Sequence, residues 1–354
     1  MIKVLQIIDG SSFGGISKLM LDVSNNIGKD IKFDFLSATK IYNDWYNLDA
    51  NRKSIKGKML YNYRLFKFLK KHEYDVIHIN SAVFLFSFQV VLIAKLVGIK
   101  KIIVHSHNSP YISKTRKIII KLLNPIYRKM TDCHLTCSKE ASKSLFTKTD
   151  DVVLIKNGVN ISKFRYNESI RNKYRKELNV DDKVVYGHVG RIHKQKNHDF
   201  LIDLFYEIQK KNPNVSLMVV GTGEDEYKVR SKVKELSIDD KVLFLGFRED
   251  TNKLLFAMDV FLFPSVHEGL PVSIIEAQTS GLPVVVSNAI TEDSHILDCF
   301  YKIDSFDLKK WIKKVETIKI NNNRKDAYKK VIDRGYDIKD TAKQLEKIYK
   351  GLIR

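Results

Sequence analysis

The sequence predicts an α/β protein built from two doubly wound domains. Short apolar runs rich in β-branched residues alternate with helical stretches, and this alternation occurs in each half of the chain. The apolar runs are nearly continuous, which is typical of parallel strands covered by helices on both faces. The length of 354 residues also exceeds that of a typical single core. Since ligands of such sheets bind at the carboxyl ends of the strands, two facing domains would form a cleft there.

The first half of the chain supplies one set of alternating elements. Its apolar runs predict strands at 2–8, 33–37, 75–79, 101–105 and 133–138. The stretches between them predict helices at 15–28, 60–72, 82–97 and 115–130. The longest apolar run, 82–94, is shorter than the roughly 20 residues that span a bilayer, so it predicts a buried helix.

The second half repeats the pattern. Strands are predicted at 184–189, 215–220, 242–245, 260–263 and 283–287, and helices at 197–211, 224–236, 250–257 and 271–281. A polar, turn-rich stretch at 157–169 separates the halves, so we place the domains at 1–165 and 166–337. A final amphipathic helix at about 338–354 follows all the strands, and we expect it to pack back on the first domain.

The net charge of +20 is concentrated in the first domain. Residues 1–165 hold 28 Lys and Arg against 12 Asp and Glu, and the runs 52–71 and 114–129 contain no acidic residue. Such a surface suits an anionic partner: a membrane face, nucleic acid or a phosphorylated substrate. In the second run, Ile118, Ile119, Leu122, Leu123, Ile126 and Met130 could form one apolar face. That face predicts either a helix packed on the sheet or a helix that docks on anionic lipid.

The cysteines and the N-terminus indicate a cytoplasmic protein. Three cysteines cannot all pair, and nothing in their spacing resembles a disulfide framework. The apolar run at the N-terminus is too short for a signal peptide. Cys133 and Cys137 have a nearby histidine but no second pair of ligands, so we expect no zinc site.

Glycines and cations follow several strands at the positions where ligands bind. Gly14 and Gly15 follow the first strand and open a helix, where free N–H groups favour an anion. Arg191 and Lys196 lie in the loop after strand 184–189, and both side chains suit a diphosphate, although a solvated loop would explain them as well. The segments 219–226 and 244–250 also place glycines after strands, which clears one edge of the sheet of side chains.

Two glutamates lie in the otherwise apolar segment PSVHEGLPVSIIEAQTSGLPVVVS, residues 264–287. Glu268 lies in the loop before a predicted helix, and Glu276 lies in its first or second turn. The helix dipole could stabilise Glu276, but it explains Glu268 poorly. Ionised glutamates are almost never buried without a partner, so we interpret both as ligands for hydroxyl groups.

The chain resembles the retaining glycosyltransferases of family 4, the glycosyl transferases group 1, which have the GT-B fold of two Rossmann-like domains. EGLPVSIIE matches their E-x7-E motif, and GRIHKQKN resembles their G-R-x4-K element. GGISK, NGV, VVGTGEDE and LGFRED follow in family order. The resemblance covers nearly the whole chain and is strongest over residues 187–287.

The resemblance implies a nucleotide-sugar donor site in the second domain and an acceptor site in the first. Arg191 and Lys196 would bind the donor diphosphate, Glu276 the ribose and Glu268 the transferred sugar. The backbone at 245–250 would contact the nucleobase. The full set of implied donor-binding residues is Gly14, Gly15, Arg191, Lys196, Thr222, Gly223, Phe247, Arg248, Glu268, Gly269, Leu270 and Glu276.

The family also uses a histidine of the first domain that faces the sugar. Here the segment IIVHSHNSP contains two candidates, His105 and His107, with Asn108 beside them. The family form T-x-H aligns with His107, which we therefore favour, and the other histidine would be structural. The implied catalytic set is His107, Glu268, Arg191 and Lys196.

The resemblance further implies the reaction and its partners. The sugar, from a UDP-sugar donor, would be transferred with retention to a lipid-linked saccharide acceptor of bacterial surface or capsular polysaccharide synthesis. No D-x-D triplet occurs in the chain, so cations and helix N-termini would stabilise the diphosphate, and we expect no metal or other cofactor. The enzyme would associate peripherally with the inner face of the membrane.

Two other functions are compatible with parts of the sequence. A nucleotide-sugar epimerase or phosphorylase would use the same fold, and an epimerase would convert the donor without an acceptor. A nucleic-acid-binding protein would explain the charge, but no DNA-binding motif is recognisable, so we expect no nucleic-acid partner.

Overall fold

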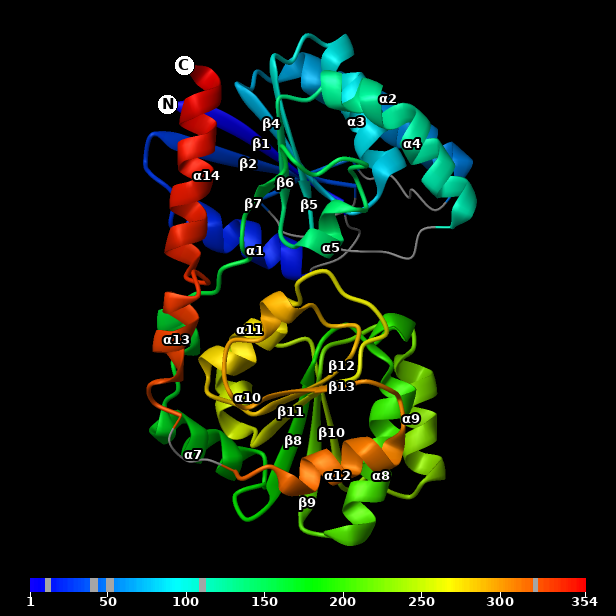
Figure 1. Cartoon of the computed structure of the whole chain (residues 1–354), viewed down its shortest axis with the longest axis vertical. Helices are drawn as coiled ribbons and strands as arrows, with labels where there is room; N and C mark the ends of the chain where they lie inside the picture. Colours follow the sequence, from blue (N-terminus) through cyan, green and yellow to red (C-terminus); the bar gives the residue numbers. More distant parts are fainter. Residues whose placement is uncertain (10–13, 39–43, 49–53, 108–112, 321–323) are drawn as a thin grey trace. The chain divides into compact units, whose positions relative to one another are not determined.

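A computed structural model describes residues 1–9, 14–38, 44–48, 54–107, 113–320 and 324–354. These residues form two compact units, which are Met1–Gly158 together with Ile338–Arg354, and Val159–Asp337 (Figure 1). The chain leaves the first unit at Gly158, within the polar stretch 157–169, and returns to it with its last helix. The boundary predicted from the sequence lies after residue 165.

The described part of the first unit contains a parallel sheet of seven strands in the order β3-β2-β1-β4-β5-β6-β7. The strands are β1 (Ile2–Ile8), β2 (Ile31–Ser37), β3 (Tyr46–Asn47), β4 (Val76–Ser81), β5 (Lys101–Ser106), β6 (Cys133–Thr136) and β7 (Val153–Leu154). The helices are α1 (Gly15–Ser24), α2 (Ile55–Lys71), α3 (Phe84–Leu96), α4 (Lys114–Lys129), α5 (Lys139–Ser142) and α14 (Ile338–Ile353).

Helices cover both faces of this sheet, as its continuous apolar strands require. Alternate strand residues such as Leu5 and Ile7 pack against α2, α3 and α4. The intervening residues, such as Val4 and Ile8, pack against α1 and α14 (Figure 1). The C-terminal helix is therefore part of the first unit's core, where Leu345 and Tyr349 are fully buried.

The second unit contains a parallel sheet of six described strands in the order β10-β9-β8-β11-β12-β13. The strands are β8 (Val184–Val189), β9 (Val215–Val220), β10 (Val242–Gly246), β11 (Val260–Phe263), β12 (Val284–Ser287) and β13 (Phe300–Ile303). Its α-helices are α6 (Ile161–Phe164), α7 (Glu168–Glu177), α8 (His198–Lys211), α9 (Glu226–Glu235), α10 (Thr251–Ala257), α11 (Val272–Thr279), α12 (Leu308–Thr317) and α13 (Ala327–Asp333). Two 3-10 turns are η1 (Lys194–Lys196) and η2 (Glu292–Ser294). Helices α8, α9 and α12 pack on one face, and α10 and α11 on the other.

The predicted α/β class with two doubly wound sheets is confirmed. Strands β1, β8, β9 and β11 have the predicted bounds, whereas the two-residue edge strands β3 and β7 and the strand β13 were not predicted. Helix α2 begins at Ile55 rather than residue 60 because the Ser54 side chain accepts a hydrogen bond from the N–H of Gly57. Helix α1 ends at Ser24 rather than 28, where Ser24 and Asn26 bind carbonyls of the last turn.

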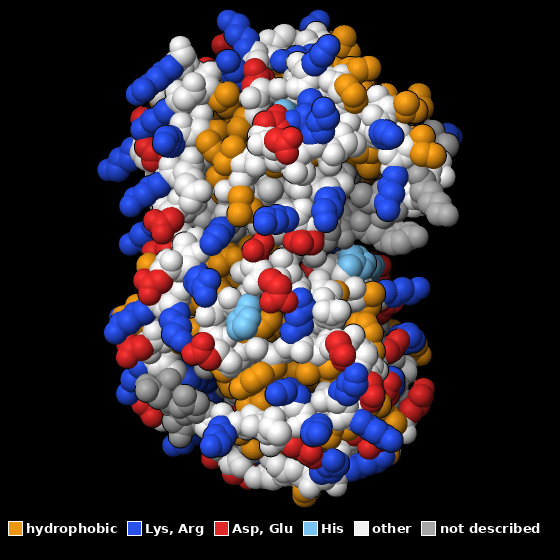
Figure 2. All heavy atoms as spheres, viewed as in Figure 1, with side chains coloured by type: hydrophobic (Ala, Val, Ile, Leu, Met, Phe, Trp, Pro, Cys, Tyr) orange, Lys and Arg blue, Asp and Glu red, His pale blue; other side chains and the backbone are white. Residues whose placement is uncertain are grey.

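The helices α2, α3 and α4 give one face of the first unit an unusual composition. Together they carry 13 lysines and arginines and no acidic residue. Ile118, Leu122 and Ile126 of α4 are more than half exposed, while Leu123 and Met130 pack against the core, so the expected single apolar face is divided. Figure 2 shows hydrophobic and basic side chains together at the upper right, where Figure 1 draws these helices.

A buried cluster of charges ties α7 to the sheet of the second unit. The Asp259 carboxylate accepts hydrogen bonds from Arg171 at 2.5 Å, from Arg175 at 3.0 Å and from the Val185 N–H at 2.8 Å. Asp259 and Arg175 are both buried. Because two guanidinium groups converge on one carboxylate, the carboxylate balances charges that would otherwise be buried alone.

We expect Asp259→Ala to lower the free energy of unfolding of the second unit by about 3–5 kcal/mol, since it leaves buried guanidinium groups unpaired. The two tryptophans, Trp45 and Trp311, lie in different units. Urea unfolding followed by Trp311 fluorescence in a Trp45→Phe background therefore reports on the second unit. As the control, Asp298→Ala removes a carboxylate whose side chain is 94% exposed, and its effect should stay below about 1 kcal/mol. Equal effects of the two substitutions would contradict the role of the cluster.

Candidate active site

The strand order of the second sheet brings two distant loops together. The sheet grows from β8 in both directions, toward β9 and β10 on one side and toward β11, β12 and β13 on the other. In sheets of this order, the crevice at the carboxyl ends of the two central strands is the usual ligand site. The loop after β8 carries Arg191 and Lys196, and the loop after β11 carries Glu268.

Lys196 and Glu268 form an ion pair at this point. The Lys196 Nζ donates to the Glu268 Oε1 at 2.8 Å, and both side chains are largely buried. The same ammonium lies 4.4 Å from the ring centroid of Phe263, the last residue of β11. The loops are also joined by Gln195, whose carbonyl accepts from the Val266 N–H at 2.8 Å and whose side chain donates to the His267 carbonyl at 2.8 Å. The buried Glu268 is therefore paired with Lys196, the residue that the sequence predicts to bind the donor diphosphate.

Arg191 lies on the exposed side of the same loop. Its guanidinium binds the Glu224 carboxylate at 3.1 Å, and His193 lies 3.1 Å from the other oxygen of that carboxylate. About half of the Arg191 side chain is exposed. The structure thus places the two predicted cations on one loop with different carboxylate partners.

Helix α11 presents backbone donors beside this ion pair. Pro271 precedes its first residue, no described side chain caps it and its first turn contains no acidic residue. Its first N–H groups therefore remain available to an anion. Glu276 lies in the second turn and is buried, and Gly269 and Leu270 are buried in the loop before the helix.

The glycines after β9 support the Arg191 loop. A Cβ atom on Gly223 would lie 2.0 Å from the Ile192 carbonyl oxygen, and one on Gly221 would lie 2.1 Å from that of Gly190. Gly221 also has a φ of +132°, which side-chain-bearing residues rarely adopt. The Ile192 N–H donates to the Thr222 carbonyl at 3.0 Å. Thr222 and Gly223 are thus in direct backbone contact with the loop that carries Arg191.

The end of β10 places Phe247 and Arg248 at the same edge of the sheet. Phe247 is half-exposed. The Arg248 guanidinium makes two hydrogen bonds of 2.7 Å to Asp250, which also accepts from the Tyr174 hydroxyl at 2.6 Å. These contacts hold the pKa of Asp250 below its usual range. The aromatic face of Phe247 and the backbone are therefore the groups here that suit a nucleobase.

In the first unit, the glycines after β1 have room around them. Gly14 precedes α1 and Gly15 is its first residue. A Cβ atom on either glycine would have no described neighbour within 4 Å. Packing within the described residues therefore does not require glycine at these positions.

Three buried histidines lie near the carboxyl ends of β4 and β5. The ring centroids of His105 and His107 are 3.9 Å apart, and those of His78 and His105 are 5.3 Å apart. Burial lowers the pKa of both His78 and His107 to about 3, so both rings are neutral at pH 7. His105 lies within β5, whereas His107 follows the strand and binds the Asn80 side chain at 2.9 Å. The predicted Asn108 lies outside the described residues.

Gln6, Asn80 and Tyr349 contact these histidines or one another, and none of them was predicted from the sequence. Gln6 lies between apolar residues of β1, whereas Asn80 lies in β4 with two other polar residues, His78 and Ser81, and Tyr349 lies in the last helix. A buried amide in an apolar run is the one signal that could have found Gln6.

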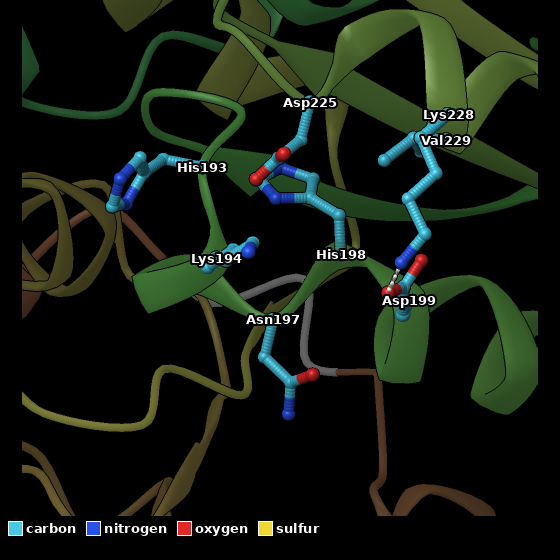
Figure 3. A pocket seen from close by; sticks show the side chains of 8 residues that line it. All are labelled: His193, Lys194, Asn197, His198, Asp199, Asp225, Lys228 and Val229. Carbon is cyan, nitrogen blue, oxygen red and sulfur yellow. Dashed lines mark hydrogen bonds and ion pairs between the residues drawn. The ribbon is translucent and has the colours of Figure 1, made fainter.

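A pocket of about 180 Å³ lies beside η1 and the start of α8 (Figure 3). It is lined by His193, Lys194, Asn197, His198, Asp199, Asp225, Lys228 and Val229. Figure 3 shows a Lys228–Asp199 ion pair at one side of it. The pocket lies next to the Arg191–Lys196 loop, but neither of these residues nor Glu268 lines it.

Two family models match the chain. The model of Glycosyl transferases group 1 matches residues 170–337, and the model of Glycosyltransferase Family 4 matches residues 40–163. The chain belongs to the group 1 glycosyltransferases. The first match falls within the second unit, so the Lys196–Glu268 pair lies in the part that the group 1 model describes.

This group 1 glycosyltransferase is similar in sequence to named bacterial glycosyltransferases. It is 26% identical to the capsular polysaccharide biosynthesis glycosyltransferase CapH of Staphylococcus aureus, over 99% of both chains. It is 31% identical to the UDP-Gal:alpha-D-GlcNAc-diphosphoundecaprenol alpha-1,3-galactosyltransferase of Escherichia coli, over 63% of this chain and 60% of the relative.

Solved structures of similar fold span the whole chain. Anabaena Alr3699/HepE, in complex with UDP-glucose, has a TM-score of 0.79 at 18% identity and covers 99% of this chain and 100% of its own. WaaG, a glycosyltransferase involved in lipopolysaccharide biosynthesis, has a TM-score of 0.73 at 15% identity and covers 98% of this chain and 100% of its own. At these identities the likeness concerns the fold alone, and it confirms the predicted GT-B fold.

The described residues show neither a cluster of metal ligands nor a membrane-spanning helix. They contain no group of three or more His, Cys, Asp and Glu side chains that could hold a metal ion. They also contain no helix of sufficient length and hydrophobicity to cross a bilayer.

We expect the stability of the first unit to fall as the pH falls below about 6.5, because His78 and His107 bind protons more readily when the chain is unfolded. For His107 alone, the loss between pH 7 and pH 5 is about 2 kcal/mol. The His107→Gln variant should therefore show a flatter pH dependence of unfolding, followed by Trp45 fluorescence in a Trp311→Phe background. The control His295→Gln replaces a half-exposed histidine of the second unit and should leave this dependence unchanged. An unchanged pH dependence in the His107 variant would contradict the conclusion that His107 is buried in its neutral form.

Proposed function

We propose that this chain transfers a sugar from a UDP-sugar to a saccharide acceptor with retention of configuration at the anomeric carbon. The observation that carries the proposal is the buried Lys196–Glu268 pair at the strand reversal of the second sheet. A structural neighbour, HepE, is described in complex with UDP-glucose, which supports a nucleotide-sugar donor. The names of CapH and of the Escherichia coli galactosyltransferase support a role in surface polysaccharide synthesis with a lipid-linked acceptor.

In this proposal, the Lys196–Glu268 pair separates when the donor binds. Lys196 transfers its hydrogen bond to the diphosphate, and the N–H groups at the start of α11 bind the same anion. Glu268 then accepts hydrogen bonds from hydroxyls of the transferred sugar, and Glu276 accepts them from the ribose. The exposed Arg191 leaves Glu224 and completes the neutralisation of the leaving diphosphate. These cations and dipoles stabilise the charge that develops as the glycosidic bond breaks, so the chain needs no metal ion.

His107 is proposed to contact a hydroxyl of the substrate. Its ring is neutral, which suits hydrogen bonding to a hydroxyl rather than charge stabilisation. Its place after β5, at the carboxyl end of the central strands, supports His107 over His105 for this role. Retention is tested by proton NMR of the product, in which the anomeric coupling constant reports the configuration of the new glycosidic bond. Formation of the inverted linkage would contradict it.

We expect Lys196→Met to weaken UDP binding by about ten- to a hundredfold, since it removes a charge-assisted hydrogen bond to the diphosphate. Lys194→Met is the matched control because it removes an exposed lysine of the same turn. Isothermal titration with UDP in the presence of EDTA measures both variants and tests metal independence at the same time. Glu268→Gln should retain UDP binding and lose sugar transfer. If Lys196→Met binds UDP as tightly as the control, the proposed role of Lys196 is wrong.

The helices α2, α3 and α4 are proposed to hold the enzyme on the inner face of an anionic membrane, next to a lipid-linked acceptor. Their 13 basic residues lack any acidic neighbour within these helices, so an anionic surface attracts the whole layer. Ile118, Leu122 and Ile126 are exposed on one side of α4 and can enter the interface between head groups and acyl chains. Charge and apolar exposure on the same helices support a lipid surface as the partner of this face.

We expect the triple substitution of Lys117, Lys121 and Lys129 by alanine to weaken binding to vesicles of anionic phospholipid by about 3 kcal/mol, at about 1 kcal/mol for each lysine. Three lysines of α14 with similar helical spacing, Lys339, Lys343 and Lys347, provide the control triple variant on the opposite face of the sheet. Vesicle co-sedimentation at low and high salt measures the difference, which should shrink as salt screens the charges. Equal losses in both triple variants would argue against a specific docking face.

A further inference from the structure

A continuous chain of buried hydrogen bonds connects the C-terminal helix to His107. The Gln6 Nε2 donates to the Tyr349 hydroxyl at 3.0 Å, and the Asn80 Nδ2 donates to the Gln6 Oε1 at 2.9 Å. The Asn80 Oδ1 lies 2.9 Å from the His107 Nε2. All four side chains are buried, and they come from α14, β1, β4 and the end of β5.

One backbone carbonyl fixes the direction of this chain. If both amides were rotated and every proton reversed, the side-chain contacts would be satisfied equally well. The Asn80 Nδ2, however, also lies 3.3 Å from the backbone carbonyl oxygen of His78, which can only accept a hydrogen bond. Rotating the Asn80 amide would place two lone pairs against each other there. The Asn80 Oδ1 must therefore face His107.

The direction of the chain determines the tautomer of His107. An amide oxygen can only accept, so the Nε2 of His107 must carry a proton. Because burial keeps the pKa of His107 at about 3, the ring has only one such proton at pH 7. The side chain of Asn157 raises this pKa, but less than burial lowers it. The Nδ1 of His107 therefore carries a lone pair.

The other end of the chain has two buried contacts. The Tyr349 hydroxyl accepts from Gln6, and the same oxygen lies 2.6 Å from the Nδ1 of His78, to which it can donate its own proton. Tyr349 is thus held by two buried partners, and it packs edge-on against the ring of Phe33. The last helix is thereby anchored to β1 through Gln6 and to β4, the strand that carries Asn80, through His78.

We propose that Tyr349, Gln6 and Asn80 are positioning residues that hold His107 in the Nε2–H tautomer, so that its Nδ1 can only accept a hydrogen bond. The consequence for catalysis rests on the proposed function: the substrate group that meets His107 must be a donor, such as a sugar hydroxyl. The C-terminal helix then contributes to the site through two intervening side chains, Gln6 and Asn80, rather than by contact.

The tautomer can be measured without any substrate. In protein labelled with ¹⁵N-histidine, long-range proton–nitrogen correlation spectra distinguish Nε2–H from Nδ1–H, and His107→Gln assigns the signal. We expect a single neutral Nε2–H tautomer at pH 7, with its N–H proton protected from exchange with water. A signal from Nδ1–H, or from a doubly protonated ring, overturns the proposal.

Substitutions test the positioning role. Asn80→Ala should expose the Nε2–H proton to exchange, and Tyr349→Phe should lower kcat about tenfold with the KM for the donor within about twofold. Tyr127→Phe is the matched control. It removes an equally buried hydroxyl, bonded to Ser87 at 2.6 Å on the opposite face of the sheet, and should change neither quantity.

The results of these experiments distinguish a failure of the positioning role from a failure of the proposed function. If the wild-type tautomer and its protection are as expected but UDP-sugars are not used, the proposed function fails and the positioning role stands. If Tyr349→Phe keeps the wild-type kcat and Asn80→Ala keeps a protected Nε2–H, the positioning role is wrong. If Asn80→Ala does not fold, the kcat of Tyr349→Phe by itself tests the positioning role.

Discussion

The ion pair between Lys196 and Glu268 depends on one topological constraint, the reversal of strand order between β8 and β11. The two residues are 72 positions apart, and they meet because parallel strands end at the same edge of a sheet. Burial then requires each charge to have a partner. The close packing of Gly221 and Gly223 on the loop after β8 holds that loop at this edge, because any side chain there would collide with its backbone. The candidate ligand site therefore lies where the chain must also balance buried charge.

Burial has a different effect in the first unit, where it keeps histidines neutral. The polar side chains on the α14 face of the sheet form a hydrogen-bonded chain in place of ion pairs. Gln6 and Tyr349 are 343 positions apart, so the beginning and the end of the sequence meet in this network. A buried network of this kind is stable only if every member finds a partner, which makes its geometry specific. The C-terminal helix is thus connected to the candidate site by the same bonds that fix it to the sheet.

The two faces of the first sheet differ in their buried side chains and in the charge of the helices that cover them. The face covered by α1 and α14 contains the buried polar network, and those helices carry both acidic and basic residues. The face covered by α2, α3 and α4 has a mainly apolar interior with a few buried polar groups such as Ser87 and Tyr127, and these helices carry no acidic residue. Successive side chains of a strand point to opposite faces of the sheet. The polar network of one face and the apolar packing of the other are therefore interleaved in the sequence of each strand. Each appears only when helices distant in the sequence are assembled on one side.

The sequence alone determined the α/β class, the two parallel sheets and the motif that carries Glu268 and Glu276, because periodicity and local spacing encode these features directly. It also indicated that Arg191 and Lys196 suit an anion. Only the tertiary structure decided that Lys196 pairs with Glu268 while Arg191 pairs with Glu224, since these contacts depend on which strands are neighbours. It also identified Asn80 and Tyr349, which no local pattern indicates, and Gln6, whose one local signal is an amide within an apolar run. Sheet order and burial determine which residues far apart in the sequence become partners. The pattern of a single strand contains no information on either.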